Sequence, residues 1–373
     1  MIVLDKIEKF IFESAAWKIV LAILMISLIK TGIWYIPNID LLINIAQNPF
    51  ENPFSNPNQH YLFWNWLGPF LAWLVGATDR WRFFAFHFAF SLAFTAIFIR
   101  FIFVNLSDKS ARISLIIFSC LPVSATSYFW VGVDSLTLFL MILSLSFPSS
   151  LLFVFVVAIL LGMQHFEQGL FASSALLIAI YLSHRQGYAL RYSWRFCAAL
   201  LVGVIVGKII LHLIFDYSGI EVNSGRPRWL QTFFPVVIQQ FFFHSQWIVW
   251  SALGLGWLVA LRFIDWGKRS VPFFISLGAL CLLLPIVGDQ TRVFAMVTFP
   301  LIAAYWLFNE DFLGNLTKKE VSLLATAWTL MPWGWVWGGG ARWSVFPHDV
   351  AYVLHRLFGW FNIPADPALW PFR

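Results

Sequence analysis

The stretch YFWVGVDSLTLFLMIL, residues 128–143, decides how the chain is interpreted. It is an almost unbroken apolar run, and its single charged residue is Asp134. A carboxylate between two long apolar segments is costly unless it faces water, a charged ligand or a partner group. We therefore expect an apolar helix that begins at Asp134, with this carboxylate at its polar end.

The rest of the chain has the same character. Of its 373 residues, 60% are hydrophobic and only 11% are charged, and the mean hydropathy is +0.78. Soluble domains carry about a quarter charged residues. Apolar runs of roughly membrane-spanning length recur, whereas the short alternating segments of a β-barrel do not. The sequence predicts an all-α polytopic membrane protein without a soluble domain.

Eleven transmembrane helices are predicted when the N-terminus is placed in the cytoplasm. Their ranges are 15–36, 82–104, 112–130, 134–148, 150–164, 167–183, 196–215, 236–261, 271–287, 291–308 and 320–338. A further apolar stretch, 60–77, is short and aromatic. We interpret it as a juxtamembrane or re-entrant helix on the outer face.

The distribution of basic residues supports this orientation. Lys and Arg are more frequent in the predicted inner loops than in the longer outer loops, as the positive-inside rule requires. We therefore expect an inner or plasma membrane protein with its site on the external face, among membrane lipids. The net charge of +6 reports orientation and not a nucleic-acid partner. The three cysteines lie inside apolar runs, without disulfide or zinc spacing.

Acidic residues gather at the predicted outer ends of the helices. Asp40 lies in the first outer loop, 37–81, and Asp134 makes up most of the second. Each could simply cap the helix that begins beside it, at 40–47 or at 134. The functional hypothesis is that both carboxylates converge on one external site, where Asp40 acts as a general base.

Arginines are the candidates for binding a phosphate. Asp289 and Arg292 have ion-pair spacing, which predicts either a cap with a salt bridge or a phosphate site on Arg292. Arg226 and Arg228 flank a loop with Trp229 and suit a lipid head group or a sugar, or ordinary interfacial anchoring.

Two further sets of residues are less specific. His165 and Glu167 lie in a predicted outer turn, 163–168, and on a helix they would point to different faces, so they form a weak metal pair or interfacial groups. We also include both among the candidates for binding the substrate or the lipid phosphate. Three tryptophans at a spacing of two precede a run of glycines, and they are typical of a sugar platform or of the aromatic belt: Trp333, Trp335 and Trp337.

The order of these features resembles the GT-C superfamily of membrane glycosyltransferases, best over residues 31–183. The acidic first loop is followed by HYLFWNWLGPFLAWLVGATDRWRFFAFHFAF (60–90), the basic turn SDKSAR (107–112) and the Asp-led stretch 128–143. The last stretch is similar to that of aminoarabinose transferases and protein mannosyltransferases. The chain divides accordingly into a GT-C-like module, 1–215, and a C-terminal transmembrane region, 216–373.

The resemblance implies that a sugar moves from a polyprenyl-phosphate-linked donor to a glycan, lipid or protein acceptor. Asp40 maps to the catalytic base and Asp134 to the second-loop acid. Many members carry adjacent acids in the first loop, whereas Asp40 is flanked by Ile39 and Leu41. This departure from the family pattern counts against a metal-assisted mechanism, and a divalent metal stays open as a cofactor.

Two alternatives predict different residues. A polymerase or ligase acting on undecaprenyl-diphosphate-linked glycans requires external arginines and tolerates loss of Asp40. A transporter or flippase requires a polar pathway, for which the candidates are Lys30, His87, Lys208 and His212. Lys208 and His212 are four residues apart on one predicted span, which also suits a helix–helix contact or a lipid phosphate.

Overall fold

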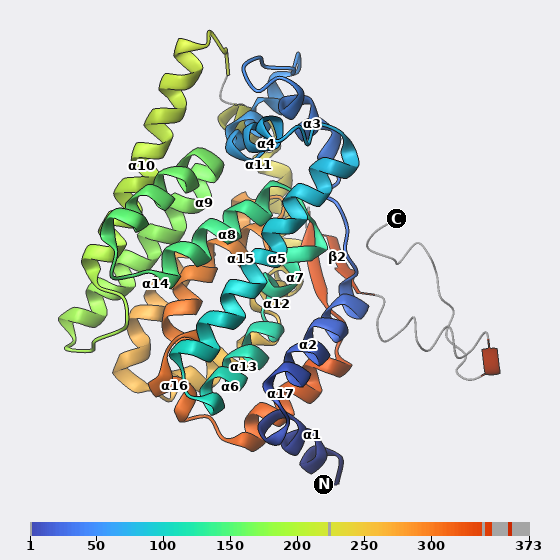
Figure 1. Ribbon diagram of the computed structural model, residues 1–373, viewed down its shortest axis with the longest axis vertical. Coiled ribbons are helices and arrows are strands. Elements are labelled where there is room, and N and C mark those ends of the chain that lie inside the picture. The colour runs from blue at the N-terminus through green and yellow to red at the C-terminus, as the bar shows by residue number, and fades with distance from the viewer. Residues whose placement is uncertain (1, 223–224, 338–339, 345–356, 360–373) are drawn as a thin grey trace.

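The computed structural model describes residues 2–222, 225–337, 340–344 and 357–359, with the backbone alone described at 2–3, 225–230, 232 and 342–343. Helices dominate this part of the chain, and one short β-hairpin accompanies them (Figure 1). The prediction of a helical protein is confirmed.

The elements of the first half run from the N-terminus to the end of a long helix. They are α1 (Ile2–Glu13), α2 (Ala16–Thr31), α3 (Ile39–Gln47), the 3₁₀ helix η1 (Pro57–Asn65), α4 (Leu67–Leu74), α5 (Arg80–Asn105), α6 (Asp108–Cys120), α7 (Pro122–Phe129), α8 (Val133–Ser146), α9 (Leu151–Arg185) and α10 (Trp194–Tyr217).

The second half consists of shorter helices and the hairpin. They are α11 (Gly225–Phe243), α12 (Ser245–Leu253), α13 (Gly256–Ile264), η2 (Gly267–Ser270), α14 (Val271–Cys281), η3 (Leu284–Ile286), α15 (Gln290–Ile302), the π-helix η4 (Ala303–Leu307), α16 (Glu310–Gly314), α17 (Lys318–Leu330), β1 (Gly334–Trp337) and β2 (Gly340–Trp343).

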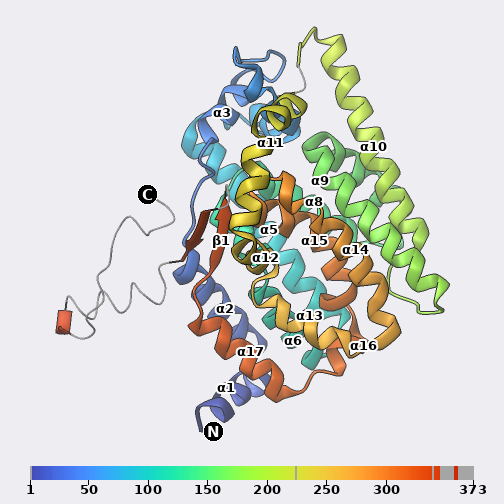
Figure 2. The ribbon, with the colours of Figure 1, turned by 180° about the vertical axis from the view of Figure 1, so that it is seen from behind.

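The helices form a bundle with α3, η1 and α4 at one end and the N-terminus at the other (Figure 1). In the core, α8 packs against α5 and α9, and α15 packs against α7, α9 and α14. Stacked aromatic rings fill part of this core, for example Phe98 on Phe118 with centroids 4.1 Å apart. From behind, α11 and α12 descend beside the hairpin (Figure 2). The α3–η1–α4 segment therefore lies over the ends of several core helices.

Several helices are suited to a membrane. Among the described residues, four helical segments are long and apolar enough to cross one: Arg80–Asn105, Leu151–Arg185, Trp194–Tyr217 and Gly267–Ile286. The pairs α6–α7 and α12–α13, bent by 67° and 80°, bring this number to six if each is one span. Membrane character is supported, whereas the predicted eleven spans are not confirmed.

The predicted span 320–338 is wrong at its C-terminal end. The helix there, α17, ends at Leu330, and the chain then forms the antiparallel pair β1–β2. Pro332 and Gly334 oppose a continuing helix, and the alternating tryptophans suit a strand. Trp335 is buried, and its ring centroid lies 4.9 Å from those of Phe129 and Trp130. It therefore belongs to the core.

The predicted break between spans 150–164 and 167–183 is present as a bend in α9. His165 has extended backbone angles, φ −156° and ψ 80°. In a straight helix, residues eight apart are separated by about 12 Å along the axis. Here Leu161 Cγ lies 3.2 Å from the Cβ position of Gly169, and Gly162 and Gly169 both face Val204. The two parts of α9 therefore bend back around α10.

Glycines allow α9 and α10 to approach closely. A Cβ on Gly207 would lie 2.1 Å from the carbonyl oxygen of Ile159, and one on Gly162 would lie 2.1 Å from that of Val204. Small residues at such contacts let helix backbones pack in a membrane. The close packing of α9 against α10 thus requires glycine at these positions.

Replacing Gly207 by alanine should destabilise the protein by roughly 1–3 kcal/mol, because the backbone oxygen of Ile159 cannot move aside as a flexible side chain would. The matched control is Gly278→Ala on α14, where a Cβ meets nothing within 4 Å. Denaturant unfolding of the purified protein measures both. Equal stability of the two variants would contradict the packing.

Candidate functional site: a buried aspartate–arginine cluster

A cluster of charged side chains is buried where α8 and α15 begin. Arg292 Nη1 lies 2.5 Å from Asp134 Oδ2, and Arg292 Nε lies 2.7 Å from Asp289 Oδ2. The side chains of Asp134, Asp289 and Arg292 are 3%, 11% and 20% exposed. Three of the predicted site residues thus meet, although 158 positions separate Asp134 from Arg292.

The positions of these residues at helix starts explain why carboxylates are tolerated there. Asp134 is the second residue of α8, and Asp289 is the residue before α15. Helix N-termini carry partial positive charge, which favours nearby carboxylates. The predicted Asp289–Arg292 ion pair is confirmed. The predicted N-cap role of Asp134 is wrong, because Gly132 holds the cap position and the Asp134 carboxylate binds Arg292.

The start of α8 is fixed by the chain that follows α2. The Val131 N–H donates to the Trp34 carbonyl at 2.7 Å, and the Ile36 N–H donates to the Val131 carbonyl at 3.0 Å. Residues 34–36 therefore join the α3 segment to the start of α8, next to Asp134.

The cluster has one more negative than positive group. Asp289 lies in the turn between η3 and α15, outside the candidate spans. Burial raises the pKa of Asp289 to about 6, with a further increase from Asp134 and an opposing effect from Arg292. The cluster therefore takes up a proton at mildly acidic pH, and Asp289 is the group that we assign it to.

This raised pKa predicts how stability depends on pH. The pKa of Asp289 in the folded protein, about 6, exceeds its ordinary value of 3.8. Protonation of Asp289 therefore stabilises the folded state. This contribution is fully present below pH 3.8 and is lost as the pH rises through about 6. Asp289→Asn should therefore melt like the wild type near pH 4 and at a higher temperature than it above pH 7. Melting curves across this pH range test this, and a difference that shrinks toward high pH would contradict it.

A glutamine joins three elements beside the cluster. The Gly68 N–H donates to Gln164 Oε1 at 2.7 Å, and Gln164 Nε2 donates to the Val133 carbonyl at 2.8 Å. Gln164 is fully buried and immediately precedes the bend in α9. It therefore holds α4, α8 and α9 together around the residue that precedes Asp134.

The bend also changes the relation of His165 and Glu167. His165 Nδ1 lies 4.0 Å from Glu167 Oε2. The expectation that they point to different faces is wrong, because His165 is not helical. Among the described residues, no group of three His, Cys, Asp or Glu side chains could hold a metal ion.

Asp40 belongs to a different ion pair. Arg80 Nε donates to Asp40 Oδ1 at 3.0 Å, Arg80 Nη2 contacts Asp40 Oδ2, and the guanidinium stands over the Tyr35 ring. The Asp40 and Arg80 side chains are 62% and 47% exposed. The short helix predicted at 40–47 is confirmed as α3, but Asn38 and not Asp40 is its N-cap residue. Asp40 and Asp134, which were predicted to share one site, belong to two separate ion pairs.

The other predicted residues belong neither to the buried cluster nor to the Asp40–Arg80 pair. Arg226 and Arg228 belong to the first turns of α11, and their side chains are outside the described part of the structure. On α10, Lys208 Nζ stands 3.2 Å from the ring centroid of Trp64, whose ring also meets that of His212. Lys30 is buried and donates to the carbonyl of Trp328.

Polar atoms beside the cluster retain bonding capacity. Asp289 Oδ1 and both side-chain amide atoms of Gln290 are buried, and none has a hydrogen-bond partner among the described residues. Buried polar groups are usually paired, and exceptions point to a catalytic role or to a bound group. The second carboxylate oxygen of Asp289 is thus able to accept a proton.

An open polar cleft of about 610 Å³ lies between the loop after α3 and the end of α10. Its lining consists of Asn48, Phe50, Glu51, Asn52, Phe54, His60, Ser218, Gly219, Ile220 and Glu221. Asn52 Nδ2 donates to the Glu221 carbonyl at 2.9 Å and ties the two walls together. The sequence did not predict this cleft, although Asn48-Pro49 and Asn52-Pro53 in its wall are turn-forming pairs.

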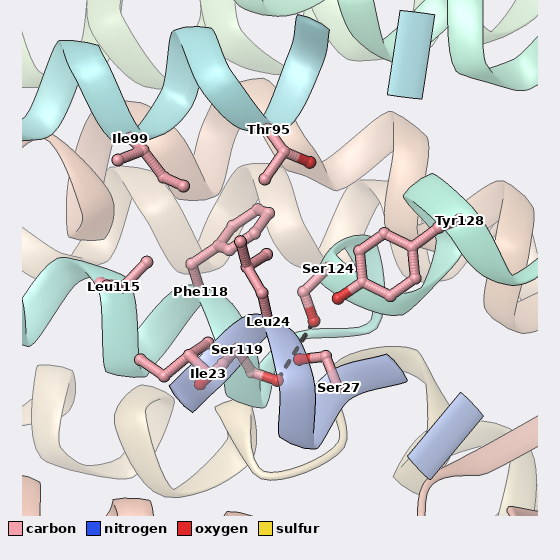
Figure 3. Close-up of a pocket in the computed structure, with 10 residues that line it drawn as sticks. All are labelled: Ile23, Leu24, Ser27, Thr95, Ile99, Leu115, Phe118, Ser119, Ser124 and Tyr128. Carbon is pink, nitrogen blue, oxygen red and sulfur yellow. Dashed lines mark hydrogen bonds between the residues drawn. The ribbon is translucent and has the colours of Figure 1, made fainter. Parts of the chain in front are cut away.

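A second cavity, inside the bundle, is a poor candidate for a site. It lies among α2, α5, α6 and α7, and its lining combines apolar side chains, such as Ile23, Leu115 and Phe118, with an equal number of hydroxyl-bearing ones (Figure 3). Its polar groups are hydroxyls, of which Ser124 bonds to the Ser119 carbonyl. Its volume of about 10 Å³ has room for roughly one water molecule.

In comparisons with known proteins, no family model, no curated protein and no solved structure matches the chain. The function is therefore inferred from the chemistry of the site.

Proposed function

We propose that this chain is a membrane glycosyltransferase that moves a sugar from a polyprenyl-phosphate carrier to an acceptor. The observation that carries the proposal is the buried Asp134–Arg292–Asp289 cluster, in which Asp289 Oδ1 has no hydrogen-bond partner among the described residues. The helices that could span a membrane supply the setting that a lipid-linked donor requires.

In the proposed reaction, Asp289 is the general base. The acceptor oxygen or nitrogen attacks the anomeric carbon and passes its proton to Asp289 Oδ1. The bond between the anomeric carbon and the phosphate oxygen breaks, and its electron pair leaves with the polyprenyl phosphate. A base with a pKa near the working pH is favoured for this step, and the pKa of Asp289 is about 6.

The other two members of the cluster position the base. Arg292 contacts Asp289 Oδ2 and leaves Oδ1 for the acceptor, while Asp134 holds the guanidinium from the opposite side. The two carboxylates already neutralise Arg292, so a phosphate there would be repelled by the excess negative charge. We therefore place the leaving phosphate nearer to Arg226 and Arg228, at the start of α11, which packs against η1 and η3.

Asp40 is the weaker candidate for the base. Its carboxylate is mostly exposed, both of its oxygens contact Arg80, and water competes for it.

The residues of the transporter alternative lie at separate places in the bundle. Lys30 lies on the contact of α2 with α17, and Lys208 and His212 lie on the contact of α10 with η1. His87 is buried on α5, where its Nδ1 bonds to the Phe83 carbonyl.

The proposal is tested with purified protein in liposomes that contain polyprenyl-phosphate hexoses labelled in the sugar, with a cell-envelope extract as acceptor. We expect label to leave the lipid fraction for the acceptor fraction. If the label crosses the bilayer while still bound to its lipid, the protein is a flippase and the proposal fails. Retention of label on every hexose tried would also count against it.

A further inference from the structure

The polar cleft beside η1 has a lining with a definite chemical bias. Two amide side chains and one hydroxyl contribute polar groups, and each amide has a second N–H beside the one that it donates within the protein: Asn48, Asn52 and Ser218. Phe50 and Phe54 add apolar faces. This combination suits a ligand with many hydroxyl groups and an apolar ring face, because each hydroxyl needs a donor or acceptor opposite it.

The charged side chains that the described lining contributes to the cleft are both acidic. Glu51 and Glu221 are exposed there, and no Lys or Arg is found among the described residues of the lining. Asn48 Nδ2 donates to Glu51 Oε2 at 3.0 Å and so orients this carboxylate. An anionic ligand would be repelled by both glutamates, whereas a neutral or cationic one would not. The cleft is therefore a poor site for a phosphate or a uronic acid.

The helix η1 connects the cleft with the buried cluster. His60 is part of its lining, and the next residue of η1, Tyr61, lies near enough to Arg292 to act on its charge. η1 also packs against α9 and α11. A chain molecule held in the cleft could therefore extend past η1 toward Asp289.

We propose that this cleft binds a carbohydrate without acidic groups, made of neutral or amino sugar units. The idea that this carbohydrate is the acceptor rests on the proposed transferase function, and it adds that acidic glycans are excluded as acceptors. The idea that the cleft binds a carbohydrate depends only on the lining of the cleft. The walls that select the ligand are the loop 48–54 and the turn 218–221.

The test measures binding without any donor, by calorimetry on the full chain in nanodiscs. The probes are three oligosaccharides of equal length, made of glucosamine, N-acetylglucosamine or galacturonic acid. We expect at least one of the two non-acidic oligomers to bind about tenfold more tightly than the galacturonic acid oligomer. The double variant E51Q/E221Q should reduce this difference to about threefold or less. Both glutamates are exposed, so these substitutions should leave the fold intact.

Glu13→Gln is the matched control and should keep the wild-type preference. Glu13 is an exposed glutamate and the last residue of α1, a helix at the opposite end of the bundle from α3 (Figure 1). Three results would overturn the carbohydrate site. The acidic oligomer binds as tightly as the other two, the affinity difference is the same in E51Q/E221Q as in the wild type, or none of the three oligomers binds. If binding behaves as expected but no sugar transfer is found, the transferase proposal fails and the cleft assignment stands.

Discussion

Asp289→Asn should lower the turnover number for sugar transfer by 10²–10⁴-fold, the range that general base catalysis usually contributes. Asparagine keeps the shape of the side chain and its contact with Arg292, but its oxygen does not take up a proton. Because the proposed mechanism places Asp289 against the acceptor and not the lipid, KM for the donor should change little. Initial rates with a labelled donor measure both constants.

The pH profile separates a catalytic role from a structural one. With a pKa of about 6, Asp289 is ionised at neutral pH, and the rate should fall as the pH decreases through this value. The residual rate of Asp289→Asn should lack this acidic limb. Asp311→Asn, an exposed aspartate on α16, is the control and should retain the wild-type profile. An unchanged acidic limb in Asp289→Asn would remove the base assignment.

Asp134→Ala should cost the largest amount of stability, roughly 3 kcal/mol. Removing one partner of a buried ion pair leaves the other charge uncompensated, which typically costs 3–5 kcal/mol. The lower end applies because Arg292 is one-fifth exposed and keeps Asp289 as a partner. Unfolding in a detergent titration measures the difference.

The exposed pair of Asp40 with Arg80 supplies the control. Both side chains are about half exposed, and such pairs contribute about 0–1 kcal/mol. Asp40→Ala should therefore unfold within about 1 kcal/mol of the wild type. A result in which both alanine variants are equally stable would show that the buried cluster is not held by its charges.

Local features were predictable from the sequence because they depend on neighbouring residues. Asp289 and Arg292 are three residues apart, so their ion pair follows from helical spacing, and the break at 163–168 follows from polar residues that interrupt an apolar run. The pairing of Asp134 with Arg292 depends on how α8 packs near α15, and no pattern in either segment specifies that.

The incorrect expectations have physical causes as well. Apolar composition around Trp333–Trp337 suggested a continued span, yet tryptophans at a spacing of two followed by glycines also describe a hairpin, and the strand forms. Asp40 precedes an apolar segment, a position that favours a helix cap. Its side chain instead reaches Arg80, a contact that the intervening loop brings about.

The central claim is that Asp289, and not Asp40, is the base of a sugar transfer. It is tested most directly by measuring label transfer from a polyprenyl-phosphate hexose under single-turnover conditions, with wild-type, Asp289→Asn and Asp40→Asn proteins in parallel. We expect Asp40→Asn to transfer label within a few-fold of the wild-type rate and Asp289→Asn to be slower by at least 100-fold. A fast Asp289→Asn protein beside an inactive Asp40→Asn protein would contradict the claim.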